Sequence, residues 1–369
     1  GWRWFQSQLE SAPKRSRTAS GHIFTFILSP MKSRPVNVQK LNAIETMGGY
    51  LIGRVFIRNA DDFKAAVLLL FRIVLLMLPF AVIEALTARN LLLEVANAIG
   101  KSYVLVQKEP RWGLDRAQGT FEHPILFGVA CGTILTLVYF VLGYRRGRLT
   151  RIFKAALVGF TAGLSLSSGP LSALMAQTMM LCYDGVFRRL KGHWTLLAIS
   201  VLCLTILIEL VANRTSAEIF ISYFAFSQAT AYNRLHIWTY GSASVMNHPV
   251  FGIGFNDWVR PYYMSSSIDM FWLVPAVRHG IPAALLLQIT FFSIFLGTIF
   301  KRLRDPRLAA FRLGFVLCLV GYYVAGWTVH YWNEVYLQFM FILGSGVWLL
   351  EERQAGAVRP TPIDWNPVP

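Results

Sequence analysis

Three polar segments interrupt the apolar runs of this chain, and the first spans residues 116–124, RAQGTFEHP. Arg116 offers a planar, permanently charged fork that suits phosphate oxygens. His123 stands before Pro124, and a His-Pro pair also suits the start of a helix. We therefore expect Arg116 and His123 to contact a phosphate-bearing ligand. The alternatives are an interfacial anchor for the arginine and a helix-start role for the histidine.

The second segment carries an arginine, a tryptophan and a histidine. Arg234 and Trp238 stand at i and i+4, so a helix would place both side chains on one face. A guanidinium beside an indole ring suits a ligand that carries phosphate or sugar. His248 follows in NHPVFGIGF, and we expect it in the same site. The glycines of this motif predict a turn rather than a nucleotide-binding loop, because the second half of the GxGxxG pattern is missing.

The third segment carries a carboxylate, Asp269, in SSSIDMFWL. A carboxylate among apolar and aromatic neighbours is partly desolvated and suits a general base. The alternative is an N-cap on a helix that starts near residue 271. Trp272 is expected to line the same site. Arg278 falls inside the next apolar run, where a charge usually faces a cavity, and Glu334 would line this opening or cap a helix.

The elements that position these residues are expected to cross a membrane. Hydrophobic residues make up 55% of the chain and charged residues only 15%, unlike a soluble domain. The formal net charge of +16 would suit nucleic acid, but the basic residues stand in short clusters between apolar runs. We therefore expect a lipid bilayer as a partner and no nucleic acid. The cysteines lie in apolar runs without metal-ligand spacing, so neither a disulfide nor a metal is expected.

Apolar runs of roughly 20 residues predict transmembrane helices. The clear candidates are 63–86, 124–143, 152–168, 170–187, 194–212, 271–300, 309–329 and 332–350. Two weaker runs are 22–30, which is too short, and 41–57, which contains Glu45 and paired glycines. We expect an all-α, polytopic bundle of about nine spans over residues 41–350. A basic segment over 1–40, expected to be truncated, precedes it, and a cytoplasmic tail over 351–369 follows.

Basic loops set the expected orientation. The loops at 145–154, 188–191 and 301–307 are dense in lysine and arginine, which predicts that they are cytoplasmic. The two long loops, 87–123 and 213–270, then lie together on the outer face. Long loops in a compact fold are usually functional or disordered. The second loop is rich in aromatic residues, which predicts short helices at the membrane interface.

The order of these motifs resembles the O-antigen ligase and Wzy-type polymerase family of bacterial membrane glycosyltransferases. The resemblance covers roughly residues 60–350 and rests on RxxGxFxHP at 116–124, SLSSG at 165–169, NRxxxW at 233–238, NHPxxGxGF at 247–255, SxDxFWL at 267–273 and a later RxG at 278–280. It implies a GT-C type fold in the bacterial inner membrane, with no metal, cofactor or nucleotide sugar. It also implies that Arg116 and Arg234 hold the diphosphate of an undecaprenyl-diphosphate-linked glycan donor.

At Asp269 the sequence departs from the ligases, which carry a histidine at or next to this position. The departure favours the exopolysaccharide polymerase branch, with Asp269 as the base that activates a glycan acceptor on the periplasmic face. The expected reaction is inverting, and a chain-length or export protein is a further expected partner. The alternatives are an O-antigen ligase acting on lipid A core or protein, a lipid-linked glycan transporter and a noncatalytic scaffold. Transporters usually show repeated halves, and none is detected in this sequence.

Overall fold

The computed structural model describes residues 35–100, 103–106, 108–212, 219 and 228–352. The chain divides into two compact units, Gly1–Ala43 and Ile44–Pro369, and the second carries the bundle described below. All the named elements of the described part are helical, which confirms the expected all-α class, and the only extended pairing there is an isolated bridge between Arg111 and Leu114. The helices are α3 (Pro35–Phe56), α4 (Ala60–Thr87), α5 (Leu91–Ile99), α6 (Pro124–Gly132), α7 (Leu135–Leu137), the π-helix η1 (Val138–Leu142), α8 (Arg148–Gly163), α9 (Ser168–Phe187), α10 (His193–Val211), α12 (Gln228–Asn247), α13 (Val274–Phe300), α14 (Pro306–Gly326), α15 (Asn333–Ser345) and α16 (Trp348–Glu351).

Among the described residues, 5 helical runs are long and apolar enough to cross a membrane. They are α4, the continuous run Pro124–Leu142 of α6 to η1, α10, α13 and α14. This finding supports a multi-pass membrane protein. The other expected spans coincide with α3, α8, α9 and the α15–α16 pair, which are shorter or less apolar, and the expected run 22–30 lies outside the described residues.

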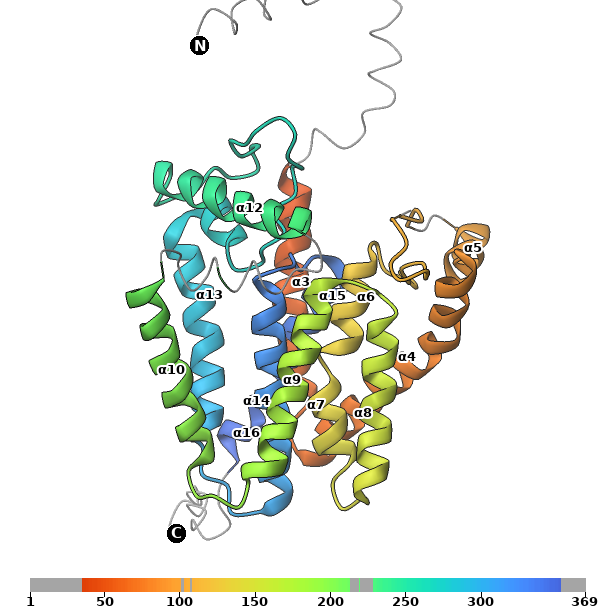
Figure 1. Cartoon of the computed structure of the whole chain (residues 1–369), viewed down its shortest axis with the longest axis vertical. Helices are drawn as coiled ribbons and strands as arrows, with labels where there is room; N and C mark the ends of the chain where they lie inside the picture. The colour runs from red at the N-terminus through yellow and green to blue at the C-terminus, as the bar shows by residue number, and fades with distance from the viewer. Residues whose placement is uncertain (1–34, 101–102, 107, 213–218, 220–227, 353–369) are drawn as a thin grey trace, which may run out of the picture. The chain divides into compact units, whose positions relative to one another are not determined.

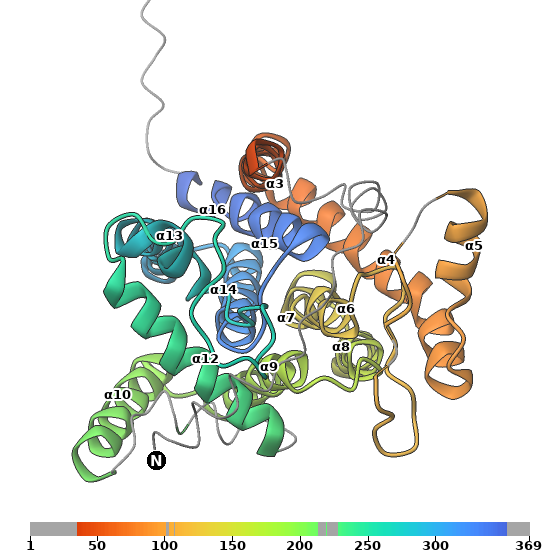
Figure 2. The same cartoon turned by 90° about the horizontal axis from the view of Figure 1, so that it is seen from above.

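Helix α14 lies in the middle of the bundle, where α9, α7 and α13 surround it (Figure 2). Small residues on α14 allow this close packing. A Cβ on Gly314 would stand 2.9 Å from the Cβ of Phe140, and a Cβ on Gly321 would stand 2.7 Å from the Nε2 of Gln177. Large aromatic side chains then fill the spaces between the helices, with Phe311 and Phe315 fully buried. The centre of the bundle is therefore packed protein rather than an open channel.

Both long loops contain a helix. Helix α5 lies in the first, and α12 lies across the ends of the bundle helices in the second (Figure 1). The aromatic loop therefore contains a helix, as expected, but α12 has 20 residues and is not the short helix that was predicted. Helix α12 packs against the start of α13. These two loops bring the polar segments 116–124 and 234–238 to the same end of the bundle.

Helix α13 is broken near its start, where Gly280 has a φ of 84°. The turn at 249–254 docks on this break: the N–H groups of Ile253 and Gly254 donate to the carbonyls of Val277 and Arg278, at 2.9 and 2.8 Å. A Cβ on Gly280 would collide with the carbonyl of Val250. The turn predicted from the glycine pattern is therefore confirmed, and the break fixes the backbone that carries Arg278.

Candidate functional site

A short turn after α8, together with the first residue of α9, forms the base of the candidate site; we call residues 165–168 the serine turn. Ser167 donates its hydroxyl hydrogen to the Ser165 carbonyl at 2.8 Å, and Leu166 adopts a left-handed conformation with φ of 45°. Neighbouring glycines make room for it, because a Cβ on Gly128 would collide with the Ser165 hydroxyl and a Cβ on Gly169 would collide with the Val329 side chain. The turn presents a carbonyl and hydroxyl groups to the loops above it.

Two arginines of the first long loop, residues 87–123, bind the serine turn. The Arg116 guanidinium donates to the Ser167 hydroxyl at 2.7 Å and to the Ser165 carbonyl at 3.3 Å. Arg111 donates to the Leu166 carbonyl at 2.7 Å. Arg116 was predicted from the sequence, whereas Arg111 was not, because nothing in its local pattern distinguishes it from an interfacial arginine.

Arg234 reaches the same turn from the second long loop, residues 213–270. It lies on α12, is only 5% exposed, and donates to the Ser168 hydroxyl at 2.8 Å. Trp238, one helical turn later, meets the indole of Trp327 edge-on at 6.0 Å. The expected helix with both side chains facing one way is therefore present. The structure brings Arg116 and Arg234 together on one turn, as the sequence predicted.

The three arginines concentrate positive charge in a largely buried place. Burial, together with the neighbouring charge of Arg111, lowers the pKa of Arg116 to about 10. The same causes lower the pKa of Arg234 to about 10, while the carboxylate of Asp269 acts in the opposite direction. Both guanidiniums stay charged at neutral pH, but the charged form is less favourable than in water. An anion bound beside them would relieve this penalty, so the arrangement suits an anionic ligand.

Asp269 lies outside the helices and within electrostatic range of Arg234. Its carboxylate accepts a hydrogen bond from the Ser267 hydroxyl at 2.6 Å and acts electrostatically on Arg234. Helix α13 begins only at Val274, with Leu273 at the N-cap position. The N-cap alternative for Asp269 is therefore wrong. The side chain is partly exposed, so a ligand held by the arginines would have access to it.

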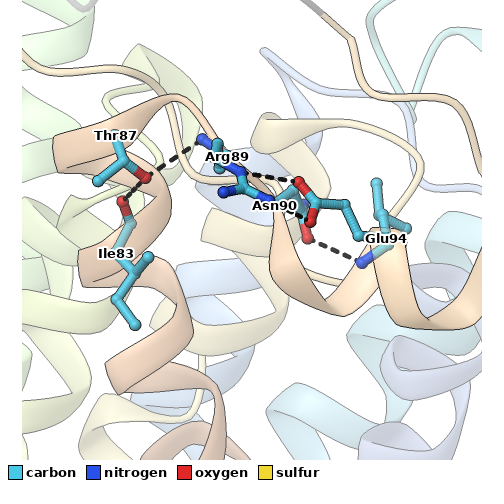
Figure 3. A network of polar contacts seen from close by, with 6 residues as sticks. Ile83, Thr87, Arg89, Asn90 and Glu94 are labelled. Carbon is cyan, nitrogen blue, oxygen red and sulfur yellow. Dashed lines mark hydrogen bonds and ion pairs between the residues drawn. The ribbon is translucent and has the colours of Figure 1, made fainter.

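A buried carboxylate at the end of α4, Glu84, holds the loop that carries Arg116. It is 3% exposed and accepts hydrogen bonds from the backbone N–H groups of Gln118 and Gly119, at 3.0 and 2.9 Å. The amide of Asn90 donates a third bond at 2.9 Å. Asn90 also caps α5, beside the exposed ion pair between Arg89 and Glu94 (Figure 3). Sequence reasoning missed Glu84, although a carboxylate inside the apolar run 63–86 was a usable signal.

His123 is the N-cap of α6, as one of the sequence alternatives held. Its Nδ1 accepts a hydrogen bond from the Ile125 N–H at 3.1 Å. Burial and the positive charges of Lys108 and Arg116 lower the pKa of His123 to about 4. The imidazole is therefore neutral at physiological pH. It lies within electrostatic range of Arg116, in the wall of the site.

Trp272 and Glu334, which were predicted to line the site, make their contacts elsewhere. Trp272 is buried in the aromatic core and donates its indole N–H to the Tyr323 carbonyl at 3.0 Å. This hydrogen bond anchors the segment that carries Asp269 to α14. Glu334 is exposed and accepts a hydrogen bond from the Tyr103 hydroxyl at 2.7 Å. This contact ties the first long loop to the start of α15.

Arg278 and His248 lie at the junction of α12 and α13. Arg278 is half-buried, with its guanidinium 5.5 Å from the centre of the Phe255 ring. Burial, together with the charge of Arg278, lowers the pKa of His330 to about 3. The His330 ring stacks on Phe271, and its buried Nδ1 has no hydrogen-bond partner among the described residues. His248 is exposed at the end of α12.

The sequence as a whole was also compared with known proteins. No protein-family model matches the chain, and no curated protein sequence matches it. The chemistry of the site is therefore inferred from the residues described above.

Proposed function

We propose that this chain is a membrane glycosyltransferase of the O-antigen ligase and Wzy-type polymerase class. In this proposal it transfers an undecaprenyl-diphosphate-linked oligosaccharide to a growing glycan on the periplasmic face of the bacterial inner membrane, within a GT-C type fold. The observation that carries the proposal is the convergence of Arg111, Arg116 and Arg234 on the serine turn. These arginines come from two loops that are far apart in the sequence, and they meet at one end of the apolar bundle.

A lipid diphosphate fits the chemistry of this place. Its two phosphates carry negative charge, and planar guanidinium groups bind phosphate oxygens with two parallel hydrogen bonds. The Ser168 hydroxyl, which accepts from Arg234, can donate a hydrogen bond of its own. The polyprenyl chain would remain in the bilayer beside the helices while the sugars lie under α12, near Trp238 and Trp327.

The proposed reaction needs one base and stabilisation of the leaving group. A hydroxyl of the acceptor sugar attacks the anomeric carbon of the donor, and its proton passes to the Asp269 carboxylate. The bond between the anomeric carbon and the phosphate oxygen breaks, and the lipid diphosphate leaves with the bonding electrons. Arg116 and Arg234 offset the charge that develops on that oxygen. A single displacement of this kind inverts the anomeric configuration.

The decisive experiment incubates the purified protein, in proteoliposomes, with lipid-linked repeat units and follows the length of the glycan. The wild-type chain is expected to lengthen the product. Arg116→Ala and Arg234→Ala should each reduce the rate by roughly 10²-fold or more, as loss of a charge-stabilising donor does in other enzymes. Asp269→Asn should block elongation while the donor still binds.

Arg89→Ala is the matched control, because Arg89 is an exposed arginine of the same outer loop whose partner is Glu94. It should leave elongation unchanged. Normal elongation by the Arg116→Ala or Arg234→Ala variant would contradict the proposed diphosphate site. Movement of the lipid-linked glycan across the vesicle membrane without a new glycosidic bond would instead identify a transporter.

A further inference from the structure

A basic hollow lies at the other end of α13 from the serine turn. Arg302, Leu303, Arg304 and Arg312 line it, and its volume is about 500 Å³. It lies where α13 ends and α14 begins, and α13 has 27 residues. At 1.5 Å per residue a helix of that length spans about 40 Å, so this hollow is separate from the arginines of the candidate site.

The acidic side chains nearest to the hollow in the sequence are already engaged. Asp305 accepts a hydrogen bond from the Arg307 backbone N–H at 2.8 Å, which caps α14. The Arg307 side chain forms an ion pair with Asp61 at the start of α4. Arg312 is half-buried and donates to the Lys301 carbonyl, which fixes its guanidinium at the wall. Three of the four lining residues are arginines, so the lining is positively charged, and Arg312 is held in place.

Apolar surface continues from the hollow along α13. Phe300, next to the lining loop, is 76% exposed, and Leu296 one turn earlier is 43% exposed. Both α13 and α14 are long and apolar enough to cross a membrane. The hollow therefore lies where two such helices end, which is the level of lipid headgroups, and an acyl chain has an apolar path beside it.

We propose that this hollow binds the phosphodiester headgroup of an anionic phospholipid. Arginine forks bind phosphate oxygens in a fixed geometry, and basic recesses between transmembrane helices on the cytoplasmic side are suited to such headgroups. The acyl chains lie against Phe300 and Leu296. A free phosphate has the same charge chemistry but gains nothing from this apolar surface. The proposal does not depend on the glycosyltransferase function.

Native mass spectrometry of the full chain in detergent tests the proposal. Phosphatidylglycerol is titrated against phosphatidylcholine of the same acyl length, and inorganic phosphate is added as a competitor. The wild-type chain is expected to retain phosphatidylglycerol selectively. The variant Arg302→Gln/Arg304→Gln should lower that retention roughly 25-fold, about fivefold for each charge removed near a lipid headgroup.

A matched control removes the same charge from another basic loop. Arg188→Gln/Arg189→Gln alters two exposed arginines after α9 and should leave retention unchanged. Arg302→Lys/Arg304→Lys keeps the charge and should retain part of the binding, which separates loss of the site from loss of folding. Equal effects of the two glutamine pairs, equal retention of phosphatidylcholine, or full displacement by inorganic phosphate would each overturn the proposal.

Discussion

Glu84 shows how a single side chain can fix the geometry of a distant arginine. Its two carboxylate oxygens accept three N–H hydrogen bonds, and two of these come from the backbone that follows Arg116. A buried carboxylate is costly unless such donors satisfy it, and donors left without it would be costly in turn. The loop is therefore held in one conformation, which places the Arg116 guanidinium on the serine turn.

Glu84→Gln should consequently destabilise the protein, because the new amide group would point an N–H toward at least one of the existing donors. We expect a loss of ~1–3 kcal/mol in the free energy of unfolding, measured by thermal or denaturant unfolding in detergent. Glu94→Gln is the control, since it alters an exposed ion pair that contributes little to stability. Equal effects of the two substitutions would contradict the role given to Glu84.

The residues of the site differ in how far the sequence reveals them. Arg116 and Arg234 were predictable because each stands in a distinctive polar motif next to an apolar run. Arg111 was not, because its role depends on how the loop folds back onto the serine turn. Trp272 was expected in the site, yet it lies in the core, since an aromatic ring between two helices packs well there. For Arg111 and Trp272, the position of the residue in the folded chain, rather than its local sequence, decides whether it belongs to the site.

At the scale of the elements, α3 and α15 approach each other through glycines. A Cβ on Gly53 would collide with the Phe341 carbonyl, and a Cβ on Gly49 would stand 2.7 Å from the Leu337 carbonyl. Gly344 faces back toward the Tyr50 carbonyl. Small residues at a helix interface allow backbones to approach closely, which is how helices associate in lipid. Gly48 and Gly49 weakened the prediction of this span from the sequence, yet Gly49 is one of the residues that let α3 pack closely against α15.

Gly53→Ala should therefore destabilise the protein by ~1–3 kcal/mol, because the added methyl group forces the two backbones apart. Gly48 provides a control in the same helix, because a methyl group added there would have nothing within 4 Å. Gly48→Ala should be neutral or stabilise by about 0.5–1 kcal/mol, as alanine favours helix. Thermal unfolding of the two variants side by side gives the comparison; a milder effect at Gly53 would contradict the packing.

The apolar runs of the sequence predicted where the helices lie, but they did not predict where those helices are broken. The expected span 124–143 is divided into α6, α7 and η1, and the expected span 271–300 starts at Val274 and breaks at Gly280. Hydrophobicity sets the length of a span but does not report the local contacts that break it. At Gly280 the break depends on the turn 249–254, which is distant enough in sequence to escape a local pattern.

At the scale of the whole molecule, the two ends of the bundle differ in their chemistry. The end with the serine turn carries α12 and the two long loops, while the loops at 143–148 and 301–305 carry exposed arginines at the other end. Helix α8 connects the two ends directly, from Arg148 to Gly163. This polarity is what the clustering of basic residues predicted.

Reporter fusions test this polarity in the cell. A reporter inserted after residue 150 should be active on the cytoplasmic side, and one inserted after residue 240 should be active on the outer side, because basic loops stay in the cytoplasm. An enzyme that is active only outside and a fluorescent protein that matures only inside give opposite signals at the two positions. The same signal at both positions would contradict the arrangement of the spans.

Helix α10 has no buried residue along its 19 positions, although it is among the most apolar helices of the chain. Its first turn is tied to α9, where the Tyr183 hydroxyl donates to the His193 carbonyl at 2.6 Å. Beyond that tie, the described part of the protein leaves α10 uncovered, and in a bilayer acyl chains would lie against such an apolar surface. A helix of this length spans roughly 28 Å, close to the ~30 Å thickness of a hydrocarbon core. A change in bilayer thickness would therefore be expected to alter the tilt of α10, and with it the entry of the chain into the second long loop.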